Sequence, residues 1–287
     1  MNVILAKSAG FCWGVRRAVE TALASAARNA TAASAPPARR PVFTDGPLIH
    51  NAHQTRLLEE SGVKEAEDLG ALAQGSTLLI RAHGISPERR QFLESLSLDL
   101  VDATCPDVAK IHRVIEARAA SGALALVYGD AGHAEVAGLL GCAGARGRVV
   151  TSPQDVEALP RQEAPVCLVA QSTQSPESFA EIADAVKRRF PGAEIIDTIC
   201  RATKMRQSEL RELAAKCDAI VVIGSPKSAN TQRLAQIASS LKQTILIDSA
   251  DDLRMRDFAG FATVAVTAGA STPDFIINAV VEKLGNA

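Results

Sequence analysis

The sequence is poor in aromatic residues, in net charge and in long apolar runs, and each shortage excludes a class of protein. Aromatic residues make up 3% of the 287 residues, which argues against a stacking platform for nucleic-acid bases. Lys and Arg number 31 against 32 Asp and Glu, so no basic excess attracts nucleic acid or an anionic membrane. No apolar run approaches the roughly 18 residues of a membrane-spanning helix. We therefore expect neither nucleic acid nor a membrane as a partner.

Targeting and cofactor motifs are also missing. The apolar start at residues 3–6 is followed by Lys7 and a turn, which lacks the length and charge order of a signal peptide, so a cytoplasmic location is expected. There is no Walker loop, no G-x-G-x-x-G fingerprint and no C-x-x-C pair. This disfavours an ordinary nucleotide site and a closed structural zinc site. The six scattered cysteines are interpreted as reduced thiols or metal ligands.

A repeat of about 95 residues organises the chain. Cys12, Cys105 and Cys200 are 93 residues (105 minus 12) and 95 residues (200 minus 105) apart. Each follows a strand-like run and precedes a helix-like one. The carboxyl end of a strand is the usual place for ligands in an open α/β sheet.

Further matches extend the repeat beyond the cysteines. Helix starts with a hydroxyl cap, Pro and an acid recur at residues 86–88, 175–177 and 272–274. Continuous apolar strands such as residues 124–128 and 219–223 indicate parallel sheets covered on both faces. Residues 27–40, rich in Ala, Ser and Pro, are interpreted as an exposed loop. We predict an α/β fold with three small parallel lobes, at residues 1–103, 104–198 and 199–287, around a central site.

The three repeated cysteines suit an iron-sulfur centre. Thiolates select zinc, copper(I) or iron-sulfur clusters. One cysteine per lobe would hold a 4Fe-4S cluster and leave one iron open to a substrate oxygen. Cys142 in a Gly-rich turn, Cys167 in a strand and Cys217 before a strand are assigned to packing.

The remaining loops of the repeats carry groups suited to a small anionic substrate. Glu135, two residues after His133, is the candidate proton donor. A carboxyl held near a cluster and a diphosphate would have its neutral form favoured. The candidate anion-binding groups are His50, His83, His133, Ser172, Thr173, Ser228, Asn230 and Ser271.

Seven motifs give the chain a specific resemblance. They are GFCWGV, RAHG, DATCP, GHAEV, the QST loop, SANTQRL and TAGAST, at residues 10–15, 81–84, 102–106, 132–136, 171–173, 228–234 and 267–272. In this order they resemble the 4-hydroxy-3-methylbut-2-enyl diphosphate reductase family, the iron-sulfur enzymes that end the methylerythritol phosphate route to isoprenoids. The similarity runs from about residue 2 to residue 285.

The resemblance implies a trefoil of three α/β lobes around a 4Fe-4S cluster held by Cys12, Cys105 and Cys200. The family removes an allylic hydroxyl with two electrons and two protons, giving isopentenyl and dimethylallyl diphosphate, with ferredoxin or flavodoxin as electron donor. By the same resemblance Glu135 delivers protons through the substrate and the hydroxyl of Ser172. The diphosphate would be held by His50, His83, His133, Ser228, Asn230 and Ser271.

Three departures from the family pattern stand near these motifs. Ser172 replaces a threonine, Ala229 replaces a common serine, and Trp13 follows the first cysteine where a small residue is frequent. No cysteine and no acid is lost, so we expect altered affinity or product ratio rather than lost activity. Two rival interpretations remain: a cluster acting as a Lewis acid in a non-redox dehydration or hydrolysis, and a non-catalytic iron-sulfur or zinc sensor.

Overall fold

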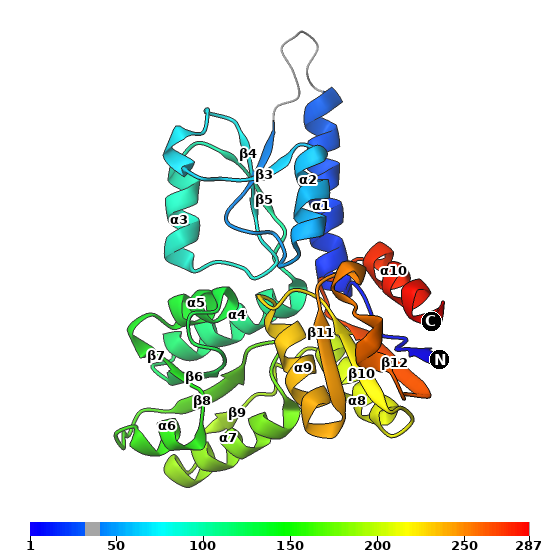
Figure 1. Ribbon diagram of the computed structural model, residues 1–287. Coiled ribbons are helices and arrows are strands. Elements are labelled where there is room, and N and C mark those ends of the chain that lie inside the picture. Colours follow the sequence, from blue (N-terminus) through cyan, green and yellow to red (C-terminus); the bar gives the residue numbers. More distant parts are fainter. Residues whose placement is uncertain (32–40, 287) are drawn as a thin grey trace. The chain divides into compact units, whose positions relative to one another are not determined.

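The computed structural model describes residues 1–31 and 41–286, which contain three four-stranded parallel sheets (Figure 1). The first sheet contains β2 (Val42–Thr44), β3 (Val63–Glu65), β4 (Thr77–Ile80) and β5 (Asp99–Asp102). The second contains β6 (Leu124–Tyr128), β7 (Gly147–Val150), β8 (Val166–Ala170) and β9 (Glu194–Ile195). The third contains β1 (Asn2–Leu5), β10 (Ala219–Ile223), β11 (Gln243–Ile247) and β12 (Thr263–Ala268). The predicted α/β class with three parallel sheets is therefore confirmed.

The three sheets repeat one strand order. It is β3-β2-β4-β5 in the first, β7-β6-β8-β9 in the second and β11-β10-β12-β1 in the third. The strand β1 thus occupies the edge position that β5 and β9 occupy in the other two, paired with β12 from Asn2 opposite Thr263 to Leu5 opposite Val266. The strand before each repeated cysteine completes a sheet, and the helix after that cysteine begins the next repeat.

Helices accompany the strands in each repeat. Their bounds are α1 (Trp13–Thr31), α2 (Ala52–Glu60), α3 (Pro87–Ser95), α4 (Pro106–Ala120), α5 (Ala134–Ala143), α6 (Pro153–Ala158), α7 (Pro176–Arg189), α8 (Arg201–Ala214), α9 (Ala229–Leu241) and α10 (Asp274–Gly285). Residues 27–31, predicted to begin an exposed loop, instead form the last part of α1. Alanine-rich sequence favours helix, so this part of the loop prediction was wrong. The remainder of that segment, residues 32–40, lies outside the described residues.

The helix starts predicted from the hydroxyl-Pro-acid pattern are found for α3 and α7. The hydroxyl oxygen of Ser86 accepts a hydrogen bond from the Arg89 N–H at 3.1 Å, and that of Ser175 accepts one from the Ser178 N–H at 3.4 Å. The third helix, α10, begins one residue later than predicted. The hydroxyl of Thr272 donates to the carbonyl of Ile223 at 3.0 Å, so it links the helix start to β10 instead of capping the helix.

Two of the sheets have an apolar core on each face, as their continuous apolar strands indicate. In β6, Leu126 packs in a cluster with α7, and Val127 packs on the opposite face with α4 and α5. In β10, Val221 packs with α10, and Val222 with α8 and α9. Parallel strands direct their carboxyl ends to one edge of a sheet, so the loops that follow those strands start from the same edge.

Two compact units make up the described chain, and each is treated separately. Unit 1 comprises Met1–Arg16, Ile49–Thr55 and Cys200–Ala287, and holds the third sheet. Unit 2 comprises Arg17–Leu48 and Arg56–Ile199, and holds the other two sheets. None of the helices within residues 1–31 and 41–286 has both the length and the apolar character needed to traverse a bilayer.

Candidate active site

Two of the repeated cysteines lie at helix starts in unit 1. Cys200 is the N-cap of α8, where its Sγ accepts a hydrogen bond from the Thr203 N–H at 3.4 Å and lies 3.1 Å from the Thr203 hydroxyl. Cys12 immediately precedes α1, and its Sγ accepts one from the Val15 N–H at 3.4 Å. Both side chains are half-buried. Amide donors and the positive end of a helix dipole therefore lie beside both sulfurs.

A buried cation accompanies these two sulfurs. Arg206, on α8, is 4% exposed and donates hydrogen bonds to the carbonyl oxygens of Ser8, Gly10 and Ala268. Burial lowers the pKa of Arg206, and the sulfurs of Cys12 and Cys200 and the carboxylate of Glu209 oppose that shift. Arg206 was not among the functional residues predicted from the sequence.

The third repeated cysteine lies in unit 2 at the start of α4. Cys105 is the N-cap of that helix, with Pro106 in its first turn, and it is half-buried. Its backbone N–H donates to the carbonyl of Ala82 at 3.0 Å. This bond fixes Cys105 beside the loop that carries His83.

The other three cysteines lie in the apolar interior. Burial raises the pKa of Cys142 to about 12 and that of Cys167 to about 11, and it also raises the pKa of Cys217. These residues are therefore neutral thiols at physiological pH. Cys142 lies within α5 and not in the turn that its glycines predicted. Gly141 permits close packing there, since a Cβ on it would lie 2.2 Å from the Cβ of Ser86.

A buried acid occupies the first turn of α5 in unit 2. The carboxylate of Glu135, 2% exposed, accepts two hydrogen bonds from Ser172: one from its N–H at 2.6 Å and one from its hydroxyl at 2.8 Å. Burial raises the pKa of Glu135 to about 7, against the lowering effect of both bonds, and Asp130 adds to the rise. A carboxyl with this pKa is substantially protonated at neutral pH and can donate a proton.

The side chain of Gln171 holds the two loops that carry Glu135 and Ser172. The side-chain oxygen of Gln171 accepts from the Asp130 N–H at 2.8 Å, and its amide nitrogen donates to the Thr173 hydroxyl at 2.9 Å. Gly129 allows the close approach, since a Cβ there would lie 2.6 Å from Val136. The ends of β6 and β8 are thereby linked, and this link fixes Glu135 relative to Ser172.

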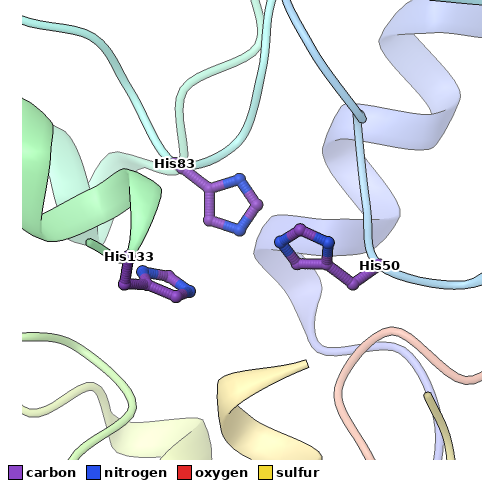
Figure 2. A group of neighbouring side chains, drawn as sticks. All are labelled: His50, His83 and His133. Carbon is purple, nitrogen blue, oxygen red and sulfur yellow. The ribbon is translucent and has the colours of Figure 1, made fainter. Parts of the chain in front are cut away.

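The rings of His83 and His133 meet edge to face in unit 2, as Figure 2 shows, with centroids 5.4 Å apart and planes at 76°. His133 caps α5, where its Nδ1 accepts from the Glu135 N–H at 3.2 Å. A neutral His133 ring therefore carries its proton on Nε2 and presents it as a donor. The third ring in Figure 2, His50, belongs to unit 1.

The loop after β4 is positioned by His112 on α4. Burial lowers the pKa of His112, which keeps the ring neutral. Its Cε1 would lie 2.8 Å from a Cβ on Gly84 and 3.3 Å from one on Gly138 in α5. Gly84 also has a positive φ of 70°. His112 thus packs between the residue after His83 and the helix that begins at His133.

Replacing Gly84 with alanine should destabilise the protein by about 2–3 kcal/mol, because a left-handed backbone strain and a clash with His112 act together. The matched control is Gly122→Ala. Gly122 has a φ of 87° and nothing within 4 Å of its Cβ position, so strain alone should cost about 1 kcal/mol. Urea unfolding of both variants measures the difference. Equal losses would contradict the packing role of His112.

The raised pKa of Glu135 also predicts a pH-dependent stability. Between pH 4.5 and about 7 the unfolded chain releases this proton while the folded protein retains it, so rising pH favours unfolding. The free energy of unfolding of the wild type, relative to Glu135→Gln, should fall by up to about 3 kcal/mol across this range. Urea titrations at several pH values test this, with Glu181→Gln, at an exposed position of α7, as the charge-matched control. A pH-independent difference would contradict the burial effect.

The polar loops of unit 1 supply hydrogen-bond donors. Ser228 caps α9, and Ser271 donates its hydroxyl to the carbonyl of His50 at 3.3 Å. Asn230 is 5% exposed, and its Nδ2 finds no hydrogen-bond partner among the described residues. A buried amide donor of this kind is costly unless a ligand accepts from it.

Similarity to known proteins decides the family. A family model described as "LytB protein" matches residues 3–285. The chain belongs to the LytB protein family. The 4-hydroxy-3-methylbut-2-enyl diphosphate reductase of Opitutus terrae is 43% identical, with 99% of each chain covered. That of Geobacter sp. strain M21 is 40% identical, covering 99% of this chain and 97% of the relative.

Solved structures of LytB-type enzymes agree in fold. The reductase from Plasmodium falciparum has a TM-score of 0.91 at 30% identity, covering 98% of this chain and 87% of that one. A second reductase, described as the terminal enzyme of the non-mevalonate pathway, has a TM-score of 0.71 at 35% identity, with both chains fully covered. Its family membership and these relatives show that this chain has the activity of a 4-hydroxy-3-methylbut-2-enyl diphosphate reductase.

The predicted site residues of this LytB protein divide between the two units. Cys12, His50, Cys200, Ser228, Asn230 and Ser271 belong to unit 1. His83, Cys105, His133, Glu135 and Ser172 belong to unit 2. Direct contacts within the units join Glu135 to Ser172, His83 to His133, and Ser271 to the backbone of His50.

Proposed function

We propose that the reductase activity uses a 4Fe-4S cluster bound by Cys12, Cys105 and Cys200. The donor set fits such a group, because all three half-buried sulfurs stand at helix starts. Two of them also have the guanidinium of Arg206 as a neighbouring positive charge. The three remaining cysteines are neutral buried thiols and are not proposed as ligands. When bound, the cluster supplies single electrons and an open iron for the substrate oxygen.

The diphosphate of the substrate is proposed to be held by neutral hydrogen-bond donors. Asn230 supports this role through its buried Nδ2, and His133 through its place at the start of α5, where its Nδ1 accepts from the Glu135 N–H. Neutral amides, hydroxyls and imidazoles can bind phosphate oxygens through many hydrogen bonds. The complete proposed set is His50, His83, His133, Ser228, Asn230 and Ser271.

Glu135 is proposed as the proton donor of the reaction, and the observation that carries this role is its buried, doubly hydrogen-bonded contact with Ser172. The allylic C–O bond breaks, two electrons enter the hydrocarbon, one proton completes the departing water and one is added to carbon. The Glu135 carboxyl supplies protons, and the Ser172 hydroxyl relays them. The products are isopentenyl and dimethylallyl diphosphate.

A positioned acid favours this enzyme over a sensor, since a sensor has no need of a buried carboxyl with a pKa of about 7. The electrons are proposed to come from ferredoxin or flavodoxin, in the cytoplasm, where thiols remain reduced.

An anaerobic assay with the allylic alcohol diphosphate and a one-electron reductant tests the proposed function. We expect both isoprenyl diphosphates to form, and to form only when the reductant is present. Turnover without an electron donor would favour the non-redox dehydration or hydrolysis. Bound iron with no turnover in either condition would favour the sensor.

A further inference from the structure

Two charged residues of α8, Arg206 and Glu209, form hydrogen bonds with residues 7–10, the segment between β1 and α1. All of these residues belong to unit 1. The carboxylate of Glu209 accepts hydrogen bonds from the N–H of Lys7 at 2.7 Å, the N–H of Ser8 at 2.9 Å and the hydroxyl of Ser8 at 2.5 Å. The guanidinium of Arg206 donates to the carbonyls of Ser8 and, at 2.7 Å, Gly10. The acid thus binds amide groups of this segment, and the base binds its carbonyl groups.

These hydrogen bonds connect the segment before Cys12 with the helix after Cys200. Arg206 and Glu209 are three residues apart and therefore share a face of α8, the helix that begins after Cys200. The segment that they hold leads directly to Cys12. A displacement of α8 relative to residues 7–10 would break both sets of hydrogen bonds. The two side chains therefore fix the Cys12 segment against the helix of Cys200.

The charge of Arg206 is not balanced by the groups to which it donates. Its guanidinium donates to carbonyl oxygens, and its Nε has no hydrogen-bond partner within the described part of the chain. A buried guanidinium is costly without a nearby negative charge. The sulfurs of Cys12 and Cys200 and the carboxylate of Glu209 oppose the lowering of the Arg206 pKa by burial. Glu209 is already engaged with Lys7 and Ser8.

We propose that Arg206, together with Glu209, is a positioning residue for the ligands Cys12 and Cys200, and that its fixed positive charge raises the reduction potential of the cluster they bind. This inference rests on the proposed iron-sulfur function. Positive charge beside a cluster stabilises its reduced, more negative state, since net charge and hydrogen bonding around the sulfurs set the potential. The fork of the guanidinium holds two carbonyls at once, which the single ammonium of lysine does not reproduce.

Three variants of the anaerobically purified holoprotein separate charge from geometry. Arg206→Gln should lower the midpoint potential of the cluster and speed the loss of iron to a chelator about tenfold or more. Arg206→Lys should keep the potential near that of wild type but lose iron faster, because charge is retained and the fork is not. Glu209→Gln should also lose iron faster. Arg211→Gln is the control on the same helix, because Arg211 donates within α8 to the carbonyl of Gln207 and should not alter either quantity.

Hydrogen exchange of the peptide spanning residues 6–11 supplies a readout that needs no cluster. Exchange at Lys7 and Ser8 should accelerate about tenfold or more in Arg206→Gln and Glu209→Gln and remain unchanged in Arg211→Gln. Unchanged exchange in both variants would overturn the positioning role. A cluster of unchanged potential in Arg206→Gln would overturn the electrostatic role. Wild-type protein that binds no iron would instead refute the proposed function, and the exchange data would still decide the positioning role.

Discussion

Replacing Glu135 with glutamine should lower kcat by a factor of about 100 to 10,000, the range that a positioned general acid contributes. Glutamine keeps the size and can still accept a hydrogen bond from Ser172, but it cannot release a proton. The carboxyl of Glu135 accepts both the N–H and the hydroxyl of Ser172 and is almost fully buried. Bulk water is therefore a poor substitute donor at this position. Steady-state kinetics with a one-electron reductant measures the loss.

The pH dependence of kcat in the wild type should follow the protonation of the Glu135 carboxyl. Because the pKa of Glu135 is raised to about 7, the donor form is present below this pH and disappears above it. We expect kcat to decrease as the pH rises through about 7, and we expect the residual kcat of Glu135→Gln to lack this decrease. A matching pH profile in the two proteins would show that another group supplies the proton.

Ser172→Ala provides the matched control for the relay. It removes the hydroxyl that donates to Glu135 at 2.8 Å but keeps the backbone N–H bond at 2.6 Å. Turnover should fall, while the iron content should remain that of wild type. Glu135→Gln should likewise retain its iron. Loss of iron from either variant would mean that the substitution disturbs the cluster site and that its kinetics do not report proton transfer.

Serine in place of Cys12, Cys105 or Cys200 should remove most of the bound iron and almost all turnover. Each of these sulfurs stands at a helix start, and a hydroxyl is a far weaker ligand than a thiolate for a soft metal centre. We expect the iron content to fall at least about tenfold in each single variant, because the three proposed ligands act together. Iron and sulfide analysis of anaerobically purified protein gives the result.

Cys142→Ser and Cys167→Ser are the internal controls. Both thiols are buried, and burial raises the pKa of each. These variants should retain wild-type iron content and activity per iron, although the serine hydroxyl will reduce stability. Iron loss confined to Cys142→Ser or Cys167→Ser, with iron retained in the Cys12 variant, would show that the proposed set of cysteine ligands is wrong.

The fold was largely predictable because its signals are local and repeated three times. Continuous apolar strands and the capped helix starts at Ser86 and Ser175 correspond to observed elements. The partner of β1 was not predictable in this way. Strand pairing between residues 2–5 and 263–266 links the two ends of the sequence, and nothing in the local pattern of Val3 or Ile4 specifies which edge that strand joins. The boundaries proposed for the three lobes remain a prediction.

Glycine led to one wrong assignment in the site region. Gly138 and Gly141 made the segment around Cys142 resemble a turn, yet both lie inside α5. These glycines meet a packing requirement inside the helix, since a Cβ at either position would approach a neighbouring element closely: His112 for Gly138 and Ser86 for Gly141. Close packing between α5 and its neighbours was a tertiary requirement that a single sequence does not reveal.

The candidate site was predictable where its residues recur with the repeat, and it was missed where they do not. Glu135 and Ser172 follow equivalent strands, so their loops identified them. Arg206 has no counterpart in this pattern. One signal was available, since Thr203, Arg206 and Leu210 continue the buried stripe of α8 at helical spacing. A charged residue on the buried face of a helix is unusual, and it would have marked Arg206 as a candidate functional residue.

Mössbauer spectroscopy, together with iron and sulfide analysis of wild-type protein purified without oxygen, tests whether the three cysteines bind one 4Fe-4S cluster per chain. We expect about four iron and about four sulfide per chain, and one iron site whose spectrum changes when substrate is added. A colourless protein that binds zinc or no metal would contradict the proposed cluster. So would a cluster in which the spectrum of no iron site changes when substrate is added.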